Sequence, residues 1–450
     1  MFSQNLIRRG ARIAGTAALA LIATGCLDDI VKVDERDVIP PDQLTTAAGA
    51  AALYAGALRS FGAAIDGDNG GTEGQSLVSG MVADEWFHSG TFSTRVDYDM
   101  RATDLNNGTL AGVYRNLNDA RTAAARAITA VTNTSDPTDP RLGALQNRIG
   151  FVYLVGAMNY CSGLTFSDLV DGQIVYGEPL TTTQMLDEAI SWFDQALAGP
   201  AGTNNINTNT ARMLKARALV LKGTANLSAA AALVATVPTT FKALSEHSIA
   251  NGGNENGIFV FNHNSKRWSL AHREGGNGLA FRGAGAGTDP AQADPRVQWT
   301  RTGVGFDNVS PQYNWLGSVG RDASMPFTTG VEARLMEAEA DLAAGNASGM
   351  IDKLNALRAT VTGLAPLTDP GSAAARQDLL FSERGFWLFG LGTRLSDLRR
   401  LVRQYGRGAE SVFPTGAYGK GGNFGSDVNL PLPNVENQNP NFQGCLDRNA

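Results

Sequence analysis

One stretch of the sequence carries the strongest information on the fold: Leu380-Phe381-Ser382-Glu383-Arg384-Gly385-Phe386-Trp387-Leu388, continued by Gly392-Thr393-Arg394-Leu395-Ser396-Asp397-Leu398-Arg399-Arg400. Read as one helix, it is so rich in apolar residues that little of its surface is left for solvent. Charged groups in that setting need partners, because an unpaired buried charge is very costly. We therefore predict an internal ion-pair network that fixes this helix to the body of the protein, formed by Glu383, Arg384, Arg394 and Asp397.

The same stretch could instead hold the two carboxylates of a glycosidase. On one continuous helix, Glu383 and Asp397 are 14 residues apart, which separates them by about 21 Å along the axis. Glycosidase carboxyl groups stand about 5–10 Å apart. The expected spacing favours the structural network over an acid–base pair.

Segments on both sides of this stretch complete a pattern that extends over the chain to about Phe442. They are Asn159-Tyr160-Cys161-Ser162-Gly163, Tyr176-Gly177-Glu178-Pro179-Leu180-Thr181-Thr182, Arg334-Leu335-Met336-Glu337-Ala338-Glu339-Ala340, Ile351-Asp352-Lys353-Leu354-Asn355-Ala356-Leu357-Arg358, Leu430-Pro431-Leu432-Pro433 and Asn439-Pro440. Together with the Glu-Arg helix, this pattern resembles the SusD/RagB family of outer-membrane lipoproteins. Phe386 and Leu391 depart from it, because many members carry acidic residues there, so the resemblance to the founding starch-binding members is less close.

The resemblance implies a function as well as a fold. Proteins of the SusD/RagB family lie as a lid on a SusC-like TonB-dependent transporter and deliver oligosaccharides or peptides to it. The family resemblance therefore implies a non-catalytic binding lipoprotein that needs no cofactor. Its implied partners are the transporter, a glycan or peptide ligand, and the membrane.

The first 26 residues read as an export signal with a lipid attachment site. Arg8, Arg9 and Arg12 precede a short apolar run that ends in Ala23-Thr24-Gly25-Cys26. The run is too short to span a bilayer and has the charged, apolar and small-residue order of a signal peptide. We expect residues 1–25 to be removed, Cys26 to carry the lipid and residues 26–41 to form a tether. The alternative is an ordinary secretory signal in which Cys26 is incidental.

Position in the cell follows from this anchor. We expect a protein lipid-anchored at the cell outer membrane, because two or more acyl chains hold a protein firmly. In lipoproteins of the bacterial group in which the SusD/RagB family abounds, acidic residues after the cysteine accompany display on the cell surface. Asp28 and Asp29 fit that pattern, although both could be plain solvated linker.

Composition and charge exclude two classes of protein. With 43% hydrophobic and 18% charged residues, the 450-residue chain has ample material for a large core and is not a disordered protein. The formal net charge is −6; loss of the three leader arginines leaves 34 Lys and Arg against 43 Asp and Glu, a charge of −9. An acidic chain without a basic stripe is a poor nucleic-acid binder. We therefore expect no nucleic-acid partner.

The chain after the tether is predicted to be mostly α-helical, a scaffold of tetratricopeptide-like helical hairpins with one irregular, loop-rich insertion. We expect an N-terminal helical region at 42–237, the insertion at 238–326, a C-terminal helical region at 327–410, and a Pro/Asn/Gly-rich tail at 411–450 that packs on the body. The expected helices cover residues 42–63, 74–86, 109–132, 141–160, 182–198, 209–233, 330–344 and 347–361. Within the insertion, Ile258-Phe259-Val260-Phe261 reads as a short strand.

Cysteine content agrees with export. Besides Cys26 there are only Cys161 and Cys445, which could form a disulfide in an oxidising compartment or remain two buried thiols. The chain has no Cys-x-x-Cys motif and no metal-binding histidine spacing. It also lacks a Gly-x-Ser-x-Gly elbow and a phosphate-binding loop. The sequence thus predicts neither a metal site nor a cofactor.

Aromatic residues supply the candidate ligand site. Sugars present C–H faces that stack on aromatic rings, and their hydroxyls bind Asn, Asp, Arg and Gln. The insertion and the segment Asp84-Glu85-Trp86-Phe87-His88 offer both kinds of side chain. The candidate ligand-binding residues are Trp86, Trp268, Trp299, Tyr313 and Trp315. For each ring the alternative is packing into the body or against a partner.

Two other functions remain open from sequence. A helical-repeat scaffold that organises envelope proteins, without binding a nutrient, would share the same helices and anchor. An α-helical hydrolase is disfavoured by the expected carboxylate spacing.

Overall fold

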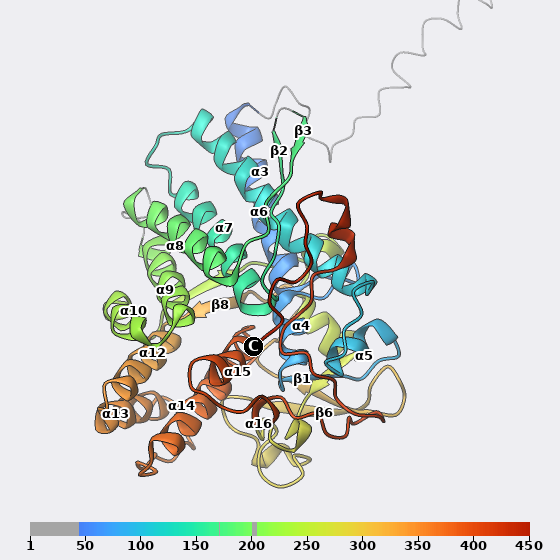
Figure 1. Ribbon diagram of the computed structural model, residues 1–450, viewed down its shortest axis with the longest axis vertical. Coiled ribbons are helices and arrows are strands. Elements are labelled where there is room, and N and C mark those ends of the chain that lie inside the picture. Colours follow the sequence, from blue (N-terminus) through green and yellow to red (C-terminus); the bar gives the residue numbers. More distant parts are fainter. Residues whose placement is uncertain (1–44, 171, 200–204) are drawn as a thin grey trace, which may run out of the picture.

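The computed structural model describes residues 45–170, 172–199 and 205–450. The predicted leader at 1–25, Cys26 and the tether at 26–41 lie outside these residues, as does the start of the predicted helix at 42–63. Helices that follow one another in the chain pack side by side along one flank of the molecule (Figure 1). They are α3 (Ala47–Asp66), α6 (Gly108–Thr134), α7 (Pro140–Asn159), α8 (Thr182–Ala198), α9 (Asn205–Lys222), α10 (Leu227–Val234), α12 (Gly330–Ala343) and α13 (Ala347–Arg358). The mostly α-helical, tetratricopeptide-like fold is thereby confirmed.

Local sequence explains where these helices begin. Asn107 caps α6 by accepting a hydrogen bond from the Leu110 amide at 3.0 Å, and Asp139 caps α7 ahead of a proline at the first helical position. Thr181 and Gln184 form a reciprocal capping box at the start of α8. Each cap satisfies an amide that the helix itself leaves without a partner.

The insertion leaves the helical body and returns to it at one place. Strand β4 (Lys242–Ser245) pairs antiparallel with β8 (Met325–Thr329), so the two ends of the insertion lie side by side between α10 and α12. Inside it, β6 (Trp299–Val304) pairs with β7 (Pro311–Trp315). Strand β5 (Trp268–Leu270) pairs with β1 (Trp86–His88), which joins the insertion to the N-terminal region. A further hairpin, outside the insertion, is formed by β2 (Asp168–Val170) and β3 (Gln173–Val175).

The remaining helices complete the body. Short helices flank β1, namely α4 (Gln75–Val82) and α5 (Ser93–Asp99), and the C-terminal part contains α14 (Ala373–Trp387), α15 (Arg394–Arg403) and α16 (Ala409–Val412). Buried apolar side chains of α4, α6, α7, α8 and α9 form one large core with the insertion and α15. Smaller clusters join α9, α10 and α12, and α12, α13 and α14. Within the described ranges, no helix has both the length and the hydropathy needed to cross a bilayer.

Three predicted elements are wrong. The expected helix at 209–233 is two helices, because the chain turns at Gly223, whose φ of +133° favours glycine. The expected strand at 258–261 is instead helical, α11 (Gly257–Phe259) followed by a π-helical turn (Val260–Asn264). A short apolar run cannot be assigned to strand or helix by periodicity alone.

The third error is the single helix at 380–400. The structure has two helices there, α14 and α15, separated by a turn that contains Gly390 and Gly392 at φ of +75° and +69°. The turn lies close to neighbouring atoms: a Cβ on Gly392 would come within 3.1 Å of Ser76. The argument from a 21 Å separation along one helix is therefore wrong in its premise.

The charged residues of this stretch are nevertheless paired. Arg384 donates from Nε and Nη2 to the two carboxylate oxygens of Asp397, at 2.8 and 2.9 Å. Arg394 binds Asp84 in the same two-point manner, at 2.6 and 2.9 Å. All these side chains are buried, so each ion pair also satisfies groups that water cannot reach.

Glu383 extends the network to other parts of the chain. It accepts hydrogen bonds from Arg296 of the insertion and from Arg358 of α13, both at 2.7 Å. A third donor is Trp387 Nε1 at 3.2 Å. The network thus fixes α14 and α15 to the N-terminal region, the insertion and α13.

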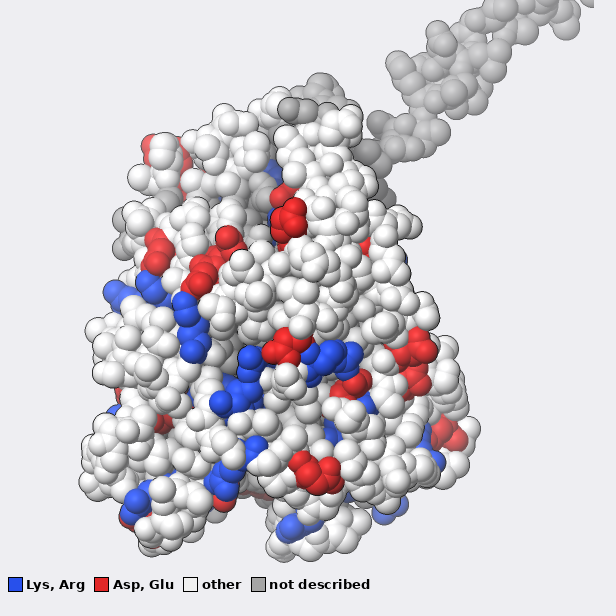
Figure 2. Space-filling view, in the orientation of Figure 1, with Lys and Arg blue, Asp and Glu red and all other residues white. Residues whose placement is uncertain are grey.

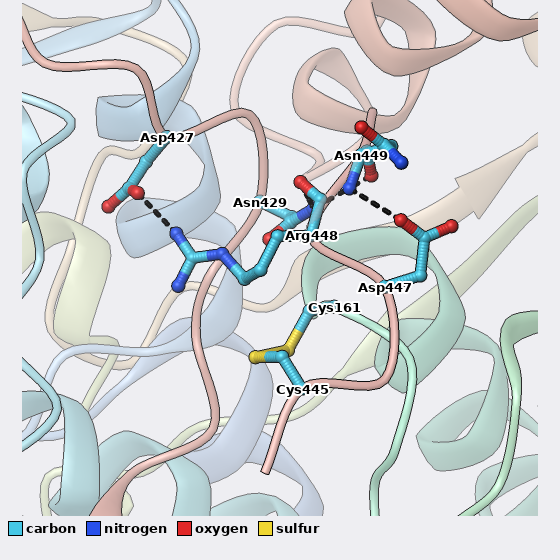
Figure 3. The surroundings of a disulfide bond; sticks show 7 residues. All are labelled: Cys161, Asp427, Asn429, Cys445, Asp447, Arg448 and Asn449. Atoms are coloured by element: carbon cyan, nitrogen blue, oxygen red, sulfur yellow. Dashed lines mark hydrogen bonds and ion pairs between the residues drawn. A yellow bond between two sulfur atoms is a disulfide. The ribbon is translucent and has the colours of Figure 1, made fainter.

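The tail packs on the body, and a disulfide joins it to the end of α7 (Figure 3). Cys161 and Cys445 are bonded, with Cα atoms 5.6 Å apart and 284 residues apart in sequence. The Cys161 amide also donates to Leu430 O at 2.9 Å, and the Leu446 amide donates to Ser162 O at 2.8 Å. Asn429 and the Asp427–Arg448 ion pair hold the last residues beside the bridge.

Candidate functional site

The five rings predicted to bind ligand lie in the core of the structure. Trp86, Trp268, Trp299, Tyr313 and Trp315 are 0–7% exposed. A buried ring cannot offer its face to a sugar, so the prediction of an exposed stacking surface at these five positions is wrong. The alternative, packing into the body, describes their environment.

These rings form a packed aromatic core between the insertion and α14–α15. Trp86 and Trp315 lie 6.1 Å apart, centroid to centroid, and each also contacts Phe389 of the turn after α14, at 5.2 and 5.3 Å. Trp299 meets Tyr313 edge to face at 5.0 Å. Tilted and edge-to-face contacts of this kind add to the stabilisation from burial.

The polar neighbours of these rings are also used internally. The Asn262 amide nitrogen donates to Trp268 O at 2.7 Å and to Tyr313 O at 3.1 Å. Gln312 Nε2 donates to Asn262 O and Trp268 O, at 2.7 and 2.8 Å. Amides that the sequence offered as sugar-binding groups instead hold β5 and β7 together.

Exposed aromatic rings occur close by, at different positions. Phe92 and Phe306 are each 47% exposed, and the Arg267 guanidinium lies over both rings, with Cζ 4.9 and 4.6 Å from their centroids. Arg95 lies over Phe92 at 4.5 Å. We call Phe92, Arg95, Arg267 and Phe306 the aromatic–arginine cluster. It presents apolar ring area at the surface beside the partly exposed Arg267, whereas Arg95 is buried and paired with Glu73.

Main-chain contacts bring the segments of the cluster together. The Ser89 amide donates to Arg267 O at 2.9 Å, and the Phe306 amide donates to Lys266 O at 2.8 Å. The Asp307 amide closes the set by donating to Ser89 O at 3.0 Å. Gly305 permits this approach, because a Cβ there would lie 2.5 Å from Ser89.

Lys420 of the tail joins the cluster to a neighbouring cavity. Its ammonium donates to Gly90 O at 2.8 Å and to Asp307 at 2.7 Å. Burial opposes ionisation of Asp307, but hydrogen bonds from Lys420, Ser310 and backbone amides hold the pKa of its carboxyl below its usual range. The Asp307 carboxyl therefore stays ionised over the whole neutral range.

The cavity beside Lys420 has a volume of about 410 Å³. Phe87, Tyr418 and Phe424 give its wall an apolar part. His272, Arg282 and Lys420 add polar groups. This combination of ring surface and a few convergent polar groups is typical of small-molecule sites.

The surroundings shift the pKa of two of these polar groups. Burial lowers the pKa of Arg282, whose guanidinium lies 3.7 Å over the Tyr313 ring and whose Nε and Nη1 have no hydrogen-bond partner in the described chain. Burial likewise lowers the pKa of His272, although its Nε2 lies 3.1 Å from Gly285 O. His272 is therefore a neutral hydrogen-bonding group at neutral pH.

Most side chains of the segment 84–88 are buried and contact the protein interior instead of a ligand surface. Asp84 is paired with Arg394, and Glu85 and His88 are fully buried. Burial raises the pKa of Glu85 to about 8 and lowers the pKa of His88 to about 3. Only Phe87 of this segment reaches the cavity wall.

Only weak sequence signals mark the residues of the aromatic–arginine cluster and of the cavity wall. Phe92 follows the small residues Ser89-Gly90-Thr91, and an aromatic residue in such a loop has little local core to enter. Phe306 stands in the insertion beside Gly305 and Asp307. Tyr418 and Phe424 lie in the tail, whose return to the insertion no local pattern predicts. Across the described residues, no group of three or more His, Cys, Asp or Glu side chains could hold a metal ion.

Comparison with known proteins identifies the fold. No protein-family model and no curated protein matches the sequence. Among solved structures, a SusD superfamily protein from Parabacteroides distasonis matches with a TM-score of 0.64 at 13% identity, over 88% of this chain and 98% of that chain. A SusD superfamily protein from Bacteroides thetaiotaomicron matches with a TM-score of 0.61 at 14% identity, over 90% and 99%.

A third match is a protein solved with a sugar. Surface glycan-binding protein A from Bacteroides thetaiotaomicron, in complex with laminarihexaose, has a TM-score of 0.60 at 13% identity, over 89% of this chain and 99% of that chain. The chain therefore has the SusD superfamily fold. The resemblance seen in the sequence is confirmed at the level of the fold.

Proposed function

We propose that this protein is a non-catalytic glycan-binding lipoprotein of the outer membrane that passes oligosaccharides to a SusC-like TonB-dependent transporter. The observation that carries the proposal is the aromatic–arginine cluster, which lies beside a cavity on a SusD-like body. A protein of the same fold has been solved with laminarihexaose.

The cluster has the chemistry that an oligosaccharide requires. Phe92 and Phe306 offer ring area to the C–H faces of sugars, and the partly exposed Arg267 carries donors for hydroxyl oxygens. The adjoining cavity extends the surface along which a chain of sugar rings could lie.

The non-catalytic part of the proposal rests on the pairing of the carboxylates in the Glu-Arg stretch. Glu383 and Asp397 each bind arginine side chains and are buried. Arg384 and Arg400 hold the pKa of Asp397 below its usual range despite its burial. Asp397, held ionised between two arginines, is unsuited to donate a proton to a glycosidic oxygen.

The membrane and transporter parts of the proposal rest on the sequence. The leader that ends at Cys26 supports lipid attachment after export. The SusD-like fold supports a transporter partner, because the family resemblance implies one.

Glycan binding is tested with the mature chain on an oligosaccharide array, followed by titration calorimetry with the tightest ligand. The double variant Phe92→Ala/Phe306→Ala is compared with the wild type. We expect binding to weaken by about tenfold for each ring removed, because truncated aromatic anchors commonly cost more than 1 kcal/mol. Tyr176→Ala is the matched control, since Tyr176 is 41% exposed but lies outside the cluster.

Two results would contradict glycan binding: no array ligand for the wild type, or equal affinity of the double variant and the wild type. If the wild type binds peptides instead of glycans, the proposed ligand class is wrong. The proposed site is still supported if the double variant loses peptide binding. The transporter partner is tested separately, by purifying the lipid-anchored protein from native membranes. A co-purifying outer-membrane barrel is expected, and purification of the chain alone would contradict that part of the proposal.

A further inference from the structure

A second cavity lies away from the aromatic–arginine cluster, where α15 meets the ends of three other helices. Its volume is about 390 Å³. The wall includes the last turn of α7, the first turn of α8, the last turn of α9 and one face of α15. In Figure 2, Lys and Arg side chains gather across the middle of the face where α9 and α15 lie in Figure 1.

The cavity wall holds four cationic side chains and no carboxylate: Lys222, Arg399, Arg400 and Arg403. Two of them are neutralised at short range, since Lys222 pairs with Asp187 and Arg400 pairs with Glu339 and Asp397. The other two are not. Arg403 reaches Asp447 only at 4.0 Å and keeps 44% of its side chain exposed. Arg399 forms no ion pair within the described part of the chain.

Arg399 is the least satisfied of these groups. It is 5% exposed, and its Nη1 donates to Ala157 O and Met158 O, at 3.0 and 2.6 Å. These bonds cap the end of α7 and account for one nitrogen of the guanidinium. Its Nε has no partner in the ranges that the structure describes. Burial and the neighbouring Arg403 lower the pKa of Arg399 to about 9, so its positive charge is held at a cost that an anion would relieve.

Of the three helix ends at the cavity, the first turn of α8 favours negative charge, whereas the ends of α7 and α9 bring carbonyl groups to the wall. The capping box occupies the amide of Gln184, whereas the amides of Thr182 and Thr183 in the first turn of α8 have no acceptor within their own helix. The carbonyl groups at the ends of α7 and α9 are already engaged: Arg399 binds those of α7, and Gln404 Nε2 donates to Val220 O and Leu221 O at 3.2 and 3.0 Å.

We propose that this cavity is an oxyanion-binding site, in which Arg399, Arg403 and the first turn of α8 bind a phosphate, sulfate or carboxylate group. The planar fork of arginine matches the oxygen geometry of these groups, and charge-assisted hydrogen bonds are the strong ones. The site is separate from the aromatic–arginine cluster, so anion binding here does not depend on glycan binding there.

Titration calorimetry of the mature chain with inorganic phosphate, sulfate and D-glucuronate tests this site. Each anion is compared with chloride at equal ionic strength, so that general screening cancels. We expect saturable binding of at least one of the three probes, and the probe that binds identifies the kind of oxyanion. Arg403→Ala should weaken that binding about tenfold, and Arg403→Glu should abolish it. Arg403 is half-exposed with one long ion pair, so both variants should fold.

Arg376→Ala is the matched control. Arg376 forms a half-exposed ion pair with Asp369 at 2.7 Å and lies outside the cavity wall, so its loss should leave anion binding unchanged. The proposal is overturned if none of the three probes binds beyond chloride. It is equally overturned if the Arg403 variants bind as tightly as the wild type or the Arg376 variant.

Discussion

Arg384 and Asp397 lie 13 positions apart in sequence, on two different helices, and meet through two hydrogen bonds of 2.8 and 2.9 Å. The pair closes the turn between α14 and α15. Burial opposes charge on both partners, but Asp397 and Glu339 keep the pKa of Arg384 above its ordinary value, and Arg384 and Arg400 keep that of Asp397 below its ordinary value. The most distinctive sequence motif of the chain is thus a structural clamp.

Removing Arg384 should destabilise the protein strongly. Arg384→Ala leaves the carboxylates of Asp397 and Glu339 buried with only part of the positive charge that neutralises them. Such a loss typically costs about 3–5 kcal/mol in the free energy of unfolding. Urea denaturation followed by circular dichroism measures this. Arg376→Ala is the control, because its pair with Asp369 is solvent-screened and should contribute little to stability. Equal losses for the two variants would show that the Arg384 pair is no clamp.

Glu85 makes stability depend on pH. Its carboxyl is fully buried and accepts a hydrogen bond from the Gly390 amide at 3.0 Å, and burial raises its pKa to about 8 from 4.5. The folded state therefore holds a proton that the unfolded state loses, so stability falls as pH rises from about 4.5 to 8. Glu85→Gln imitates the protonated side chain and removes this contribution.

The Glu85→Gln variant should match the wild type in urea midpoint at pH 4.5 and exceed it at pH 8.5. The difference in unfolding free energy is on the order of 3–5 kcal/mol at the higher pH. Other titrating groups are common to both proteins and cancel in the comparison. A difference that is constant over this pH range would contradict the assignment to Glu85.

The disulfide should stabilise the attachment of the tail. Cys161→Ser/Cys445→Ser opens a loop of 284 residues, and loss of a native disulfide typically costs about 2–5 kcal/mol. Thermal unfolding with and without a thiol reductant tests this. The wild type should lose stability in reductant, and the double variant should not respond to it. A wild type that is insensitive to reductant would show that the bridge contributes nothing.

Alanine substitution of a buried aromatic ring should lower the free energy of unfolding far more than substitution of an exposed one. Trp268→Ala should lower the free energy of unfolding by about 3–5 kcal/mol, because a large fully buried ring leaves a cavity. Phe92→Ala, at a half-exposed ring, should cost far less. Urea denaturation of both variants decides the matter: similar losses would mean that Phe92 belongs to the core and offers no surface to a ligand.

Much of the fold could be predicted from the sequence, because helix signals are local. The periodic apolar residues and the caps at Asn107, Asp139 and Thr181 place α6, α7 and α8 to within a few residues. The errors occur where tertiary contacts decide. Gly223 and the glycines after Trp387 turn the chain, but glycine within an apolar run does not by itself indicate a break.

The candidate site could not be predicted in the same way. Trp315, for example, is a reasonable binding residue by type, yet large rings in a loop-rich segment also provide its core, and the burial of this ring depends on partners such as Phe389. The exposed cluster depends on the pairing of β1 with β5, and the cavity depends on the return of the tail. Both relationships join segments that are far apart in sequence.

The most direct test of the central claim is a crystal structure of the mature chain with the oligosaccharide that binds most tightly on the array. We predict a sugar ring against Phe92 or Phe306, with hydroxyl groups bound to Arg267 and the oligosaccharide continuing toward Lys420. An oligosaccharide bound elsewhere, with the aromatic–arginine cluster empty, would contradict the account.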